Sequence, residues 1–311
     1  RLTGDLALFA ALLPQQIEAR GPLEADIALS WGGDSPLRAQ AQLSSPGGSV
    51  TQFYPEGESA TFSWDVLQAT LRQDDRGLAL QAGLLQDDRQ RLALSVQLPP
   101  DRAGLLQGEV AIDALQVGAL RPFLPQLERL EGTLNGQVML SGSVQEPLAD
   151  GILRWTDGVV RLELNPTELD AVELQIALQG SRADLRGVAL LGGGQLELTG
   201  DAQLGEEPAL RLNIKGDNNR LLYPPSTQVE VSPDLQLAMT SSGIQARGEV
   251  LVHEGLLAYE ELPPGSVTLS DDVVEVDFTG KPLEAHNPLR LDADLRLRID
   301  DRFRIRGKDL N

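Results

Sequence analysis

Hydrophobic and polar residues alternate with a period of two over most of this chain. The clearest run lies near the end, where every second residue from Leu289 to Ile299 is apolar and the residues between them, Arg290 to Asp300, are all charged. Successive side chains of a β-strand point to opposite faces of a sheet. The run therefore predicts a strand with one dry face and one solvated face.

The same alternation returns in several other segments, which are separated by residues that favour tight turns. The further alternating runs are Leu92–Leu98, Leu134–Leu140 with an interruption at Gly136, Val172–Leu178 and Leu210–Ile214. The turn formers are Ser45-Pro46-Gly47-Gly48, Asp74-Asp75-Arg76-Gly77, Gly216-Asp217-Asn218 and Pro263-Pro264-Gly265. Short strands joined by such turns predict an antiparallel meander.

Internal similarity supports a repetitive all-β structure. Leu71 to Leu80 reads LRQDDRGLAL and Leu85 to Leu94 reads LQDDRQRLAL, so two neighbouring segments are close to copies. A looser module, in which glycine stands between two apolar residues, recurs around Gly4, Gly132 and Gly248. Stacked β modules explain both observations.

Helical signal is confined to two short segments. Residues 114–130 and 9–19 carry apolar residues at helical spacing, but prolines at 122, 125 and 14 limit them to single turns. We expect both to be connectors packed on a sheet, with a soft joint at residues 99–130. Residues 1–311 otherwise read as one extended β unit, an internal fragment of a longer protein.

Composition narrows the possible partners. Hydrophobic residues make up 41% of the chain but aromatics only 4%, so the dry face consists of Leu, Val, Ile and Ala. The formal net charge of −20 disfavours electrostatic binding to nucleic acid or to an anionic bilayer surface. The absence of cysteine excludes disulfides and thiolate-bound zinc, and suits an oxidising compartment. No apolar run reaches the roughly 18 residues that span a bilayer.

Candidate chemistry is sparse. The two histidines, His253 and His286, are expected to be a polar-face strand residue and a loop residue. The Asp pairs at 74/75, 87/88, 271/272 and 300/301 lack the spacing of a calcium loop and are interpreted as turn residues, with a paired-carboxylate glycosidase as the minor alternative. Gly192-Gly193-Gly194 lacks the lysine of a phosphate loop and is expected to be a bulge or tight reversal. We therefore predict no enzyme, no metal site and no cofactor.

The one-sided apolar stripe must be covered. Two arrangements satisfy this requirement: a closed β-sandwich, or a sheet curled into a U whose apolar interior is open to a guest molecule. A cell-surface β-helix or adhesin is disfavoured because the chain lacks Asn ladders and regular polar loops.

Several ordered strings distinguish between these arrangements, because they resemble the TamB family of translocation and assembly modules. The strings are Phe123-Leu124-Pro125, Leu130 to Val138, Leu140 to Ser143, Pro147 to Gly151, Gly192 to Gly200, Val231 to Leu235, Ile244 to Val250, Glu261 to Val267 and Ser270 to Val274. Their order is the one expected in the conserved C-terminal domain of that family. The resemblance runs from about residue 120 to the end, and earlier residues share only the general pattern.

The resemblance implies a bridge-like lipid-transfer protein of the bacterial periplasm. Such a protein has an inner-membrane anchor, here absent, and a U-shaped, taco-like β structure that carries phospholipid acyl chains in a hydrophobic groove toward the outer membrane. It also implies a link to the outer-membrane barrel protein TamA and to the assembly of outer-membrane proteins such as autotransporters. On this hypothesis the groove-lining residues are Leu174, Ile176, Leu212, Ile214, Leu235, Leu237, Leu291, Leu295 and Leu297. An alternative function is a chaperone-like scaffold that templates nascent barrel strands at its sheet edge.

Overall fold

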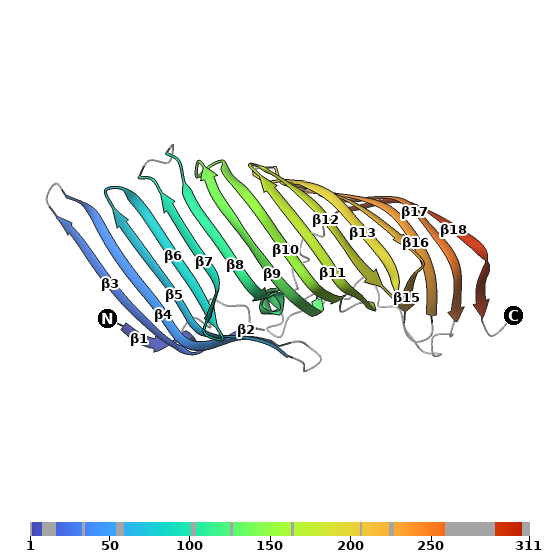
Figure 1. The fold of residues 1–311 in the computed structure, drawn as a ribbon, viewed down its shortest axis with the longest axis horizontal. Coiled ribbons are helices and arrows are strands. Elements are labelled where there is room, and N and C mark those ends of the chain that lie inside the picture. The colour runs from blue at the N-terminus through green and yellow to red at the C-terminus, as the bar shows by residue number, and fades with distance from the viewer. Residues whose placement is uncertain are drawn as a thin grey trace, which may run out of the picture.

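The chain folds into one large β-sheet, seen in a computed structural model that describes residues 2–7, 17–32, 35–53, 59–100, 104–124, 127–162, 165–205, 207–223, 227–258 and 290–306. Within these residues the sheet has 18 strands (Figure 1). They are β1 (Leu2–Asp5), β2 (Ile17–Arg20), β3 (Pro22–Gly32), β4 (Ser35–Phe53), β5 (Ser59–Asp74), β6 (Gly77–Gln86), β7 (Arg89–Leu98), β8 (Gln107–Gln116), β9 (Leu127–Gly142), β10 (Pro147–Leu162), β11 (Asn165–Gln179), β12 (Arg182–Leu191), β13 (Gly194–Gln203), β14 (Ala209–Asp217), β15 (Asn219–Tyr223), β16 (Thr227–Thr240), β17 (Gly243–Ala258) and β18 (Arg290–Arg306).

The topology is the predicted meander. From β3 to β14 each strand pairs with the next in antiparallel fashion, and β16 and β17 continue in the same way. The exception is β18, which runs parallel to β17. Among the described strands, β18 has no registered pairing with β1, β2, β3 or β4, so the two ends of the described sheet are not paired with each other. The expectation of an elongated, curled, mostly antiparallel sheet is thus confirmed.

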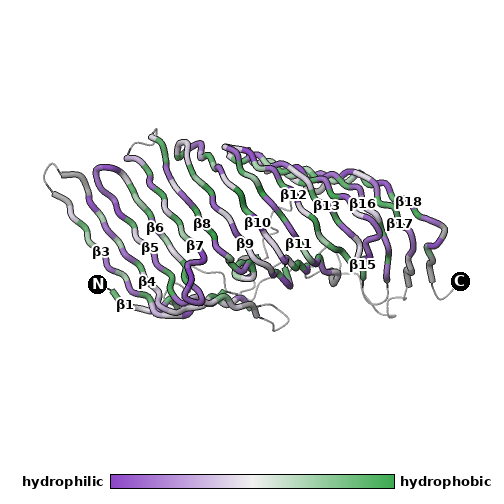
Figure 2. The backbone as a smooth tube through the Cα atoms, viewed as in Figure 1, coloured by the Kyte–Doolittle hydropathy of each residue, from purple (hydrophilic) through white to green (hydrophobic). Residues whose placement is uncertain are grey.

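Strand register aligns the apolar residues of successive strands on one face. Directly paired residues share a face of the sheet, and one such row crosses the molecule without a polar residue. The row is Ala25, Leu43, Ala69, Ala82, Leu94, Val110, Val138, Gly151, Leu178, Ala183, Ala202, Leu210, Met239 and Ile244. We call this face the inner face. Figure 2 shows the resulting alternation of hydrophobic and hydrophilic residues along the strands.

The opposite face, the outer face, is polar. A typical row there is Arg154, Gln175, Arg186, Thr199, Asn213, Gln236, Arg247 and Asp294. The chain thus separates its two kinds of side chain across a single layer.

A line of unusual backbone conformations, here called the crease, crosses the sheet. Positive φ angles occur at Gly47 of β4, Ala114 of β8, Gly132 of β9, Asp157 of β10 and Ala171 of β11. In β8 to β11 the strand pairing also shifts register at or beside these residues. Bulges and left-handed residues bend a strand sharply. The crease divides the sheet into a long wall, containing most strand residues, and a short wall beyond it.

The N-terminal end of the crease is a corner made by glycines and a tryptophan. Strands β2 and β3 both pair with β4 and are separated only by Gly21, whose added Cβ would lie 2.7 Å from Gly48 Cα. Trp64 is buried against Gly48 and donates its indole N–H to Ser45 Oγ at 3.3 Å. The prediction of a chain reversal at residues 45–48 is wrong. Strand β4 continues through this segment without reversing, although it bends there.

The most buried cluster lies beside this corner. Trp64, Leu84 and Leu115 form it, and Phe62, Leu134 and other half-buried apolar side chains pack around them. Trp64 belongs to the short wall, whereas Leu84 and Leu134 belong to the inner face of the long wall. Side chains of the two walls therefore meet on the apolar side, which makes the inner face the concave one.

Two hairpins stop at the crease, and two short elements occupy the space beyond them. Beyond the β6–β7 turn at Asp87-Asp88 lies the 3-10 helix η2 (Val117–Phe123), which packs against β4, β5 and β9. The β12–β13 turn at Gly192-Gly193 is followed by β15, which packs against β11 to β13 and pairs with β16. The tight reversal expected at Gly192–Gly194 is confirmed. The one expected at residues 216–218 is wrong, because β14 and β15 run in the same direction along β16.

The remaining local predictions have mixed outcomes. Within residues 114–130 the only described helix is η2, a short connector as expected. Residues 17–19, the last part of the other helical candidate, belong to strand β2, so that part of the prediction is wrong. Asp300-Asp301 lies in a bulge within β18 and not in a turn. Pro263-Pro264-Gly265, Asp271-Asp272, His286 and Leu289 lie outside the described residues.

Candidate functional site

The inner face is the main candidate site, and it contains the predicted groove-lining residues. Leu212 pairs with Leu237, and Ile214 pairs with Leu235. Leu237 in turn pairs with Ala246, and Leu235 with Gly248, which is aligned with Leu295. Four strands at the C-terminal end of the sheet, β14, β16, β17 and β18, thus contribute to one apolar surface.

The other predicted residues extend this surface in both directions. Leu174 pairs with Trp155, and Ile176 pairs with Leu153, so both lie on the inner face of β11. Leu297 is aligned with Val250 on β17. The backbone of Leu291 is aligned with Ile244, which is consistent with the same register.

Burial differs between the two faces and from place to place on the inner face. Leu174, Ile176, Leu212, Ile214, Leu235 and Leu237 are half-buried. On the outer face of the neighbouring strands, apolar side chains such as Val188 and Leu190 are 43% and 41% exposed. At the edge strand β18 the exposure of Leu295, Leu297 and Ile299 rises to 45%, 65% and 59%. Between β11 and β16 the inner face is therefore more crowded than the outer face, but it is not sealed like a closed core.

Glycines on the inner face explain how this surface can be concave. An added Cβ at Gly136 would lie 2.7 Å from Leu153 Cδ2, and one at Gly200 would lie 2.7 Å from Leu212 Cδ2. A leucine from the adjacent strand already fills each space. Small residues beside large ones let a curved face pack without overlap, and sequence alternation alone did not single out these positions.

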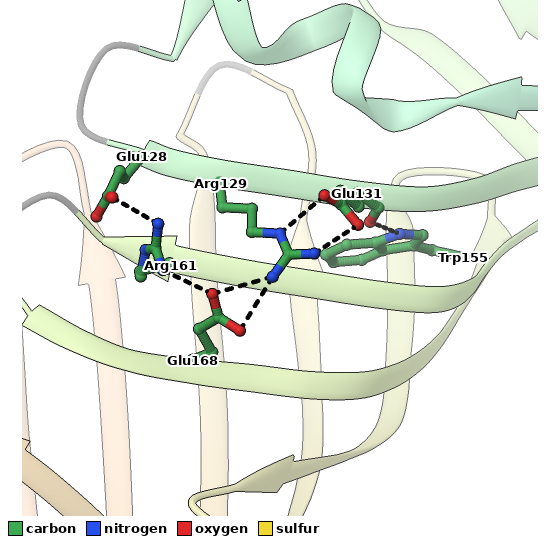
Figure 3. Close-up of polar contacts among 6 residues, drawn as sticks. All are labelled: Glu128, Arg129, Glu131, Trp155, Arg161 and Glu168. Atoms are coloured by element: carbon green, nitrogen blue, oxygen red, sulfur yellow. Dashed lines mark hydrogen bonds and ion pairs between the residues drawn. The ribbon is translucent and has the colours of Figure 1, made fainter. Parts of the chain in front are cut away.

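Charged residues hold the short wall together on its outer face (Figure 3). Glu168 of β11 accepts hydrogen bonds from Arg129 of β9 at 3.1 Å and from Arg161 of β10 at 2.8 Å. Arg161 also pairs with Glu128, and Arg129 with Glu131. The hydrogen bond from Arg129 lowers the pKa of the Glu131 carboxyl from its ordinary value. The hydrogen bonds from Arg129 to Glu131 and Glu168 raise the pKa of Arg129 above its ordinary value.

The described polar groups do not assemble an evident reaction centre. Ser232 Oγ lies 2.7 Å from His253 Nε2 and 3.4 Å from Asp217 Oδ1, and it accepts the backbone N–H of Asn218. In a Ser-His-Asp triad the carboxylate orients the histidine, whereas here it contacts the serine. These contacts instead tie the β14–β15 junction to β17. His253 is thus a half-buried strand residue, as predicted.

A metal site and hollows away from the inner face are the other candidates in the described part of the chain. No group of three or more His, Cys, Asp or Glu residues there is close enough to hold a metal ion. Hollows of about 430 Å³ and 390 Å³ lie on the outer face, around Gly83 and Asn213. Polar side chains such as Gln68, Gln81 and Arg211 line these hollows together with apolar ones.

Comparison with known families gives two matches, which together cover most of the chain. A sequence model described as the TamB N-terminal domain matches residues 3–154, and one described as the TamB C-terminal domain matches residues 184–311. The chain belongs to the TamB family. No solved structure matches it.

The two TamB matches extend and correct the motif-based resemblance. The first 120 residues, which shared only the general pattern, are covered by the N-terminal domain of the TamB family. The strings between Phe123 and Gly151 also fall in that match and not in the C-terminal one. Within the described part of this TamB-family chain, no helix is both long enough and apolar enough to cross a bilayer.

Proposed function

We propose that this chain is a length of a periplasmic lipid bridge, in which phospholipid acyl chains lie along the inner face and head groups stay in water. The observation that carries the proposal is the unbroken apolar row from Ala25 to Ile244, on a concave face whose leucines in β11, β14 and β16 are only half-buried. A closed core would bury them fully. Membership of the TamB family supports the same conclusion.

Binding of this kind needs no specific contacts. Each CH₂ group kept out of water contributes about 0.8 kcal/mol, and a lining of Leu, Val, Ile, Ala and Gly offers the same environment at every strand. A lipid can therefore move along the face without meeting a deep energy minimum. The role requires no catalysis and no cofactor, and we propose neither.

Photo-crosslinking on the two faces tests this function. A photoreactive amino acid at Leu212 or Leu237 is expected to capture phospholipid in cells, because both side chains lie on the inner face. The adjacent residues Asn213 and Gln236 are paired with each other on the outer face and serve as matched controls. Equal capture from both faces, or none from either, contradicts the proposal.

A charge in the lining provides an independent test. Leu212→Arg and Leu295→Asp place a charge on the inner face, where Leu212 is half-buried and Leu295 is 45% exposed. Both variants are expected to fold, to copurify with less lipid and to reduce transport. Asn213→Arg is the matched outer-face control. Global unfolding of Leu295→Asp would indicate a sealed core instead of an open groove.

A second function is favoured by β18. This strand pairs with β17 on one side, and no registered pairing with another described strand is found along its other edge. An uncovered strand edge can add a strand of another protein through backbone hydrogen bonds. We propose that nascent outer-membrane proteins can be templated in this way, and that the complete protein meets the TamA barrel through other parts. A crosslinker at Arg298 of β18 should then capture barrel protein, whereas one at Gln236 should not.

A further inference from the structure

The short wall consists of three hydrogen-bonded flaps separated by two seams. Pairing of β5 with β6 ends at Val66, and pairing of β8 with β9 ends at Gln116 and Thr133. Below these points η2 lies between β5 and β9. Pairing of β11 with β12 ends at Leu169 and Leu191, and below it β15 lies beside β11. The long wall has continuous registered pairing across both places.

Each flap is held together more firmly than the seams between them. In the middle flap, β9, β10 and β11 are joined by ladder pairing and by the network of Arg129, Arg161 and Glu168 (Figure 3). In the next flap, all five residues of β15 pair with β16. Opening of the short wall is therefore expected at a seam and not within a flap.

Among the described residues, Thr167 bridges the seam between β11 and β15. Thr167, which is buried, accepts the backbone N–H of Leu222 at 2.9 Å and donates its hydroxyl to the carbonyl oxygen of the same residue at 3.3 Å. A single hydroxyl thus satisfies both backbone groups of Leu222 where a partner strand would otherwise do so.

Apolar side chains mark both sides of this seam. Leu221 and its paired residue Val229 are half-buried, whereas Leu222, next in β15, is 48% exposed on the other face. On β12, which β15 also contacts, Leu190 is 41% exposed on the outer face. An acyl chain at this seam would meet apolar groups outside as well as inside the wall.

We propose that the seam between β11 and β15 is a lateral portal through which acyl chains enter or leave the groove, with Thr167 as its latch. The inference rests on the proposed lipid-binding function and adds a route to it. Breaking the two Thr167 hydrogen bonds separates the flaps, while the continuous long wall keeps the molecule folded.

Removal of the latch is the first test. Thr167→Val keeps the shape of the side chain and removes its hydroxyl, leaving Leu222 without these two partners. Exchange of fluorescent phospholipid between the protein and neutral vesicles is expected to become about fivefold faster, the effect of losing roughly one net hydrogen bond. Amide hydrogen exchange at Leu222 should accelerate as well. Thr199→Val, on the outer face of β13 away from the seam, is the control and should leave both rates unchanged.

Locking the seam is the second test, and it is practicable because the chain contains no cysteine. A Thr167→Cys/Leu222→Cys variant should exchange lipid faster than wild type before treatment, and much more slowly after closure with a short bis-maleimide. Each single-cysteine variant, treated in the same way, controls for alkylation.

The outcomes separate the portal from the function beneath it. If lipid is bound but the locked and unlocked forms exchange it equally fast, the portal is wrong and lipid enters from an end. If no form binds lipid and inner-face crosslinkers at Leu212 capture none, the proposed function fails as well.

Discussion

Glycine and tryptophan have complementary roles at the points where this sheet bends. Trp64 lies against Gly48, and Trp155 lies within van der Waals reach of the position that a Cβ on Gly158 would occupy. Trp155 also donates its indole N–H to the carbonyl oxygen of Glu131 at 3.1 Å, across the crease. At both places a large ring occupies the space that a missing side chain leaves, so the bend is filled as well as permitted.

Substitution of an inner-face glycine tests this role. Gly200→Ala would place a methyl group 2.7 Å from Leu212 Cδ2 and against the backbone of β14. The free energy of unfolding is expected to fall by about 1–3 kcal/mol, the usual cost of overpacking, in a chemical denaturation experiment. Gly83→Ala is the control, because its nearest neighbours at 3.3 and 3.4 Å are the ends of flexible glutamines. A loss of the same size in both variants would exclude crowding as the cause.

The charge network makes a prediction about pH. Because Arg129 lowers the pKa of Glu131 in the folded protein, the pair stabilises the fold above the ordinary carboxyl pKa of 4.5. That contribution should decrease as the pH falls through 4.5 toward the lowered value. Thermal unfolding should therefore show Glu131→Gln less stable than wild type at neutral pH, with the two converging in acid. A constant difference across this range would contradict the assignment.

At the scale of secondary structure, alternation located the strands but not all of their ends. Pro46, Gly47 and Gly48 favour a turn locally, yet residues 48–53 of β4 retain their pairing with β5 beyond the bend. A strand bend and a chain reversal use the same residues, since both need glycine and left-handed conformations. Only the pairing of the following segment distinguishes them, and local sequence does not contain it.

The β6–β7 hairpin is a place where an element can be improved. Its two turn residues, Asp87 and Asp88, have φ angles of 53° and 58°, which glycine adopts without strain. Asp88→Gly is expected to raise the free energy of unfolding by about 0.5–1 kcal/mol. Arg76→Gly in the β5–β6 turn is a suitable contrast, because Arg76 has no positive φ to relieve and should lose stability. Equal effects at the two turns would refute this explanation.

The molecule as a whole is a single bent layer whose length comes from strand number. Strands spaced about 4.8 Å apart give the long wall a width of about 70 Å across the strands. A compact protein of this chain length would have a radius of gyration of about 20 Å. Small-angle scattering should give a clearly larger value and an elongated profile. A value near 20 Å would mean that the inner face is covered by its own chain.

The alternating sequence by itself determined which side chains lie together. With a period of two, a strand has no choice about which residues share a face, and a register error of one residue would move every leucine to the wrong side. The all-β class, the meander and the dry inner face, including Leu212 and Leu237, follow from that local geometry. The glycine reversal at Gly192–Gly193 was likewise available from local residues.

The tertiary structure decided what that dry face encloses. The crease depends on left-handed residues in several strands lying side by side, the seams depend on where hairpins end relative to distant strands, and the latch joins Thr167 to Leu222, 55 residues away. These are relationships between segments far apart in the chain, and none leaves a periodic signal in any one of them. The alternation of side chains along each strand therefore specified an apolar face. Pairing between distant strands made that face concave and divided the short wall into flaps.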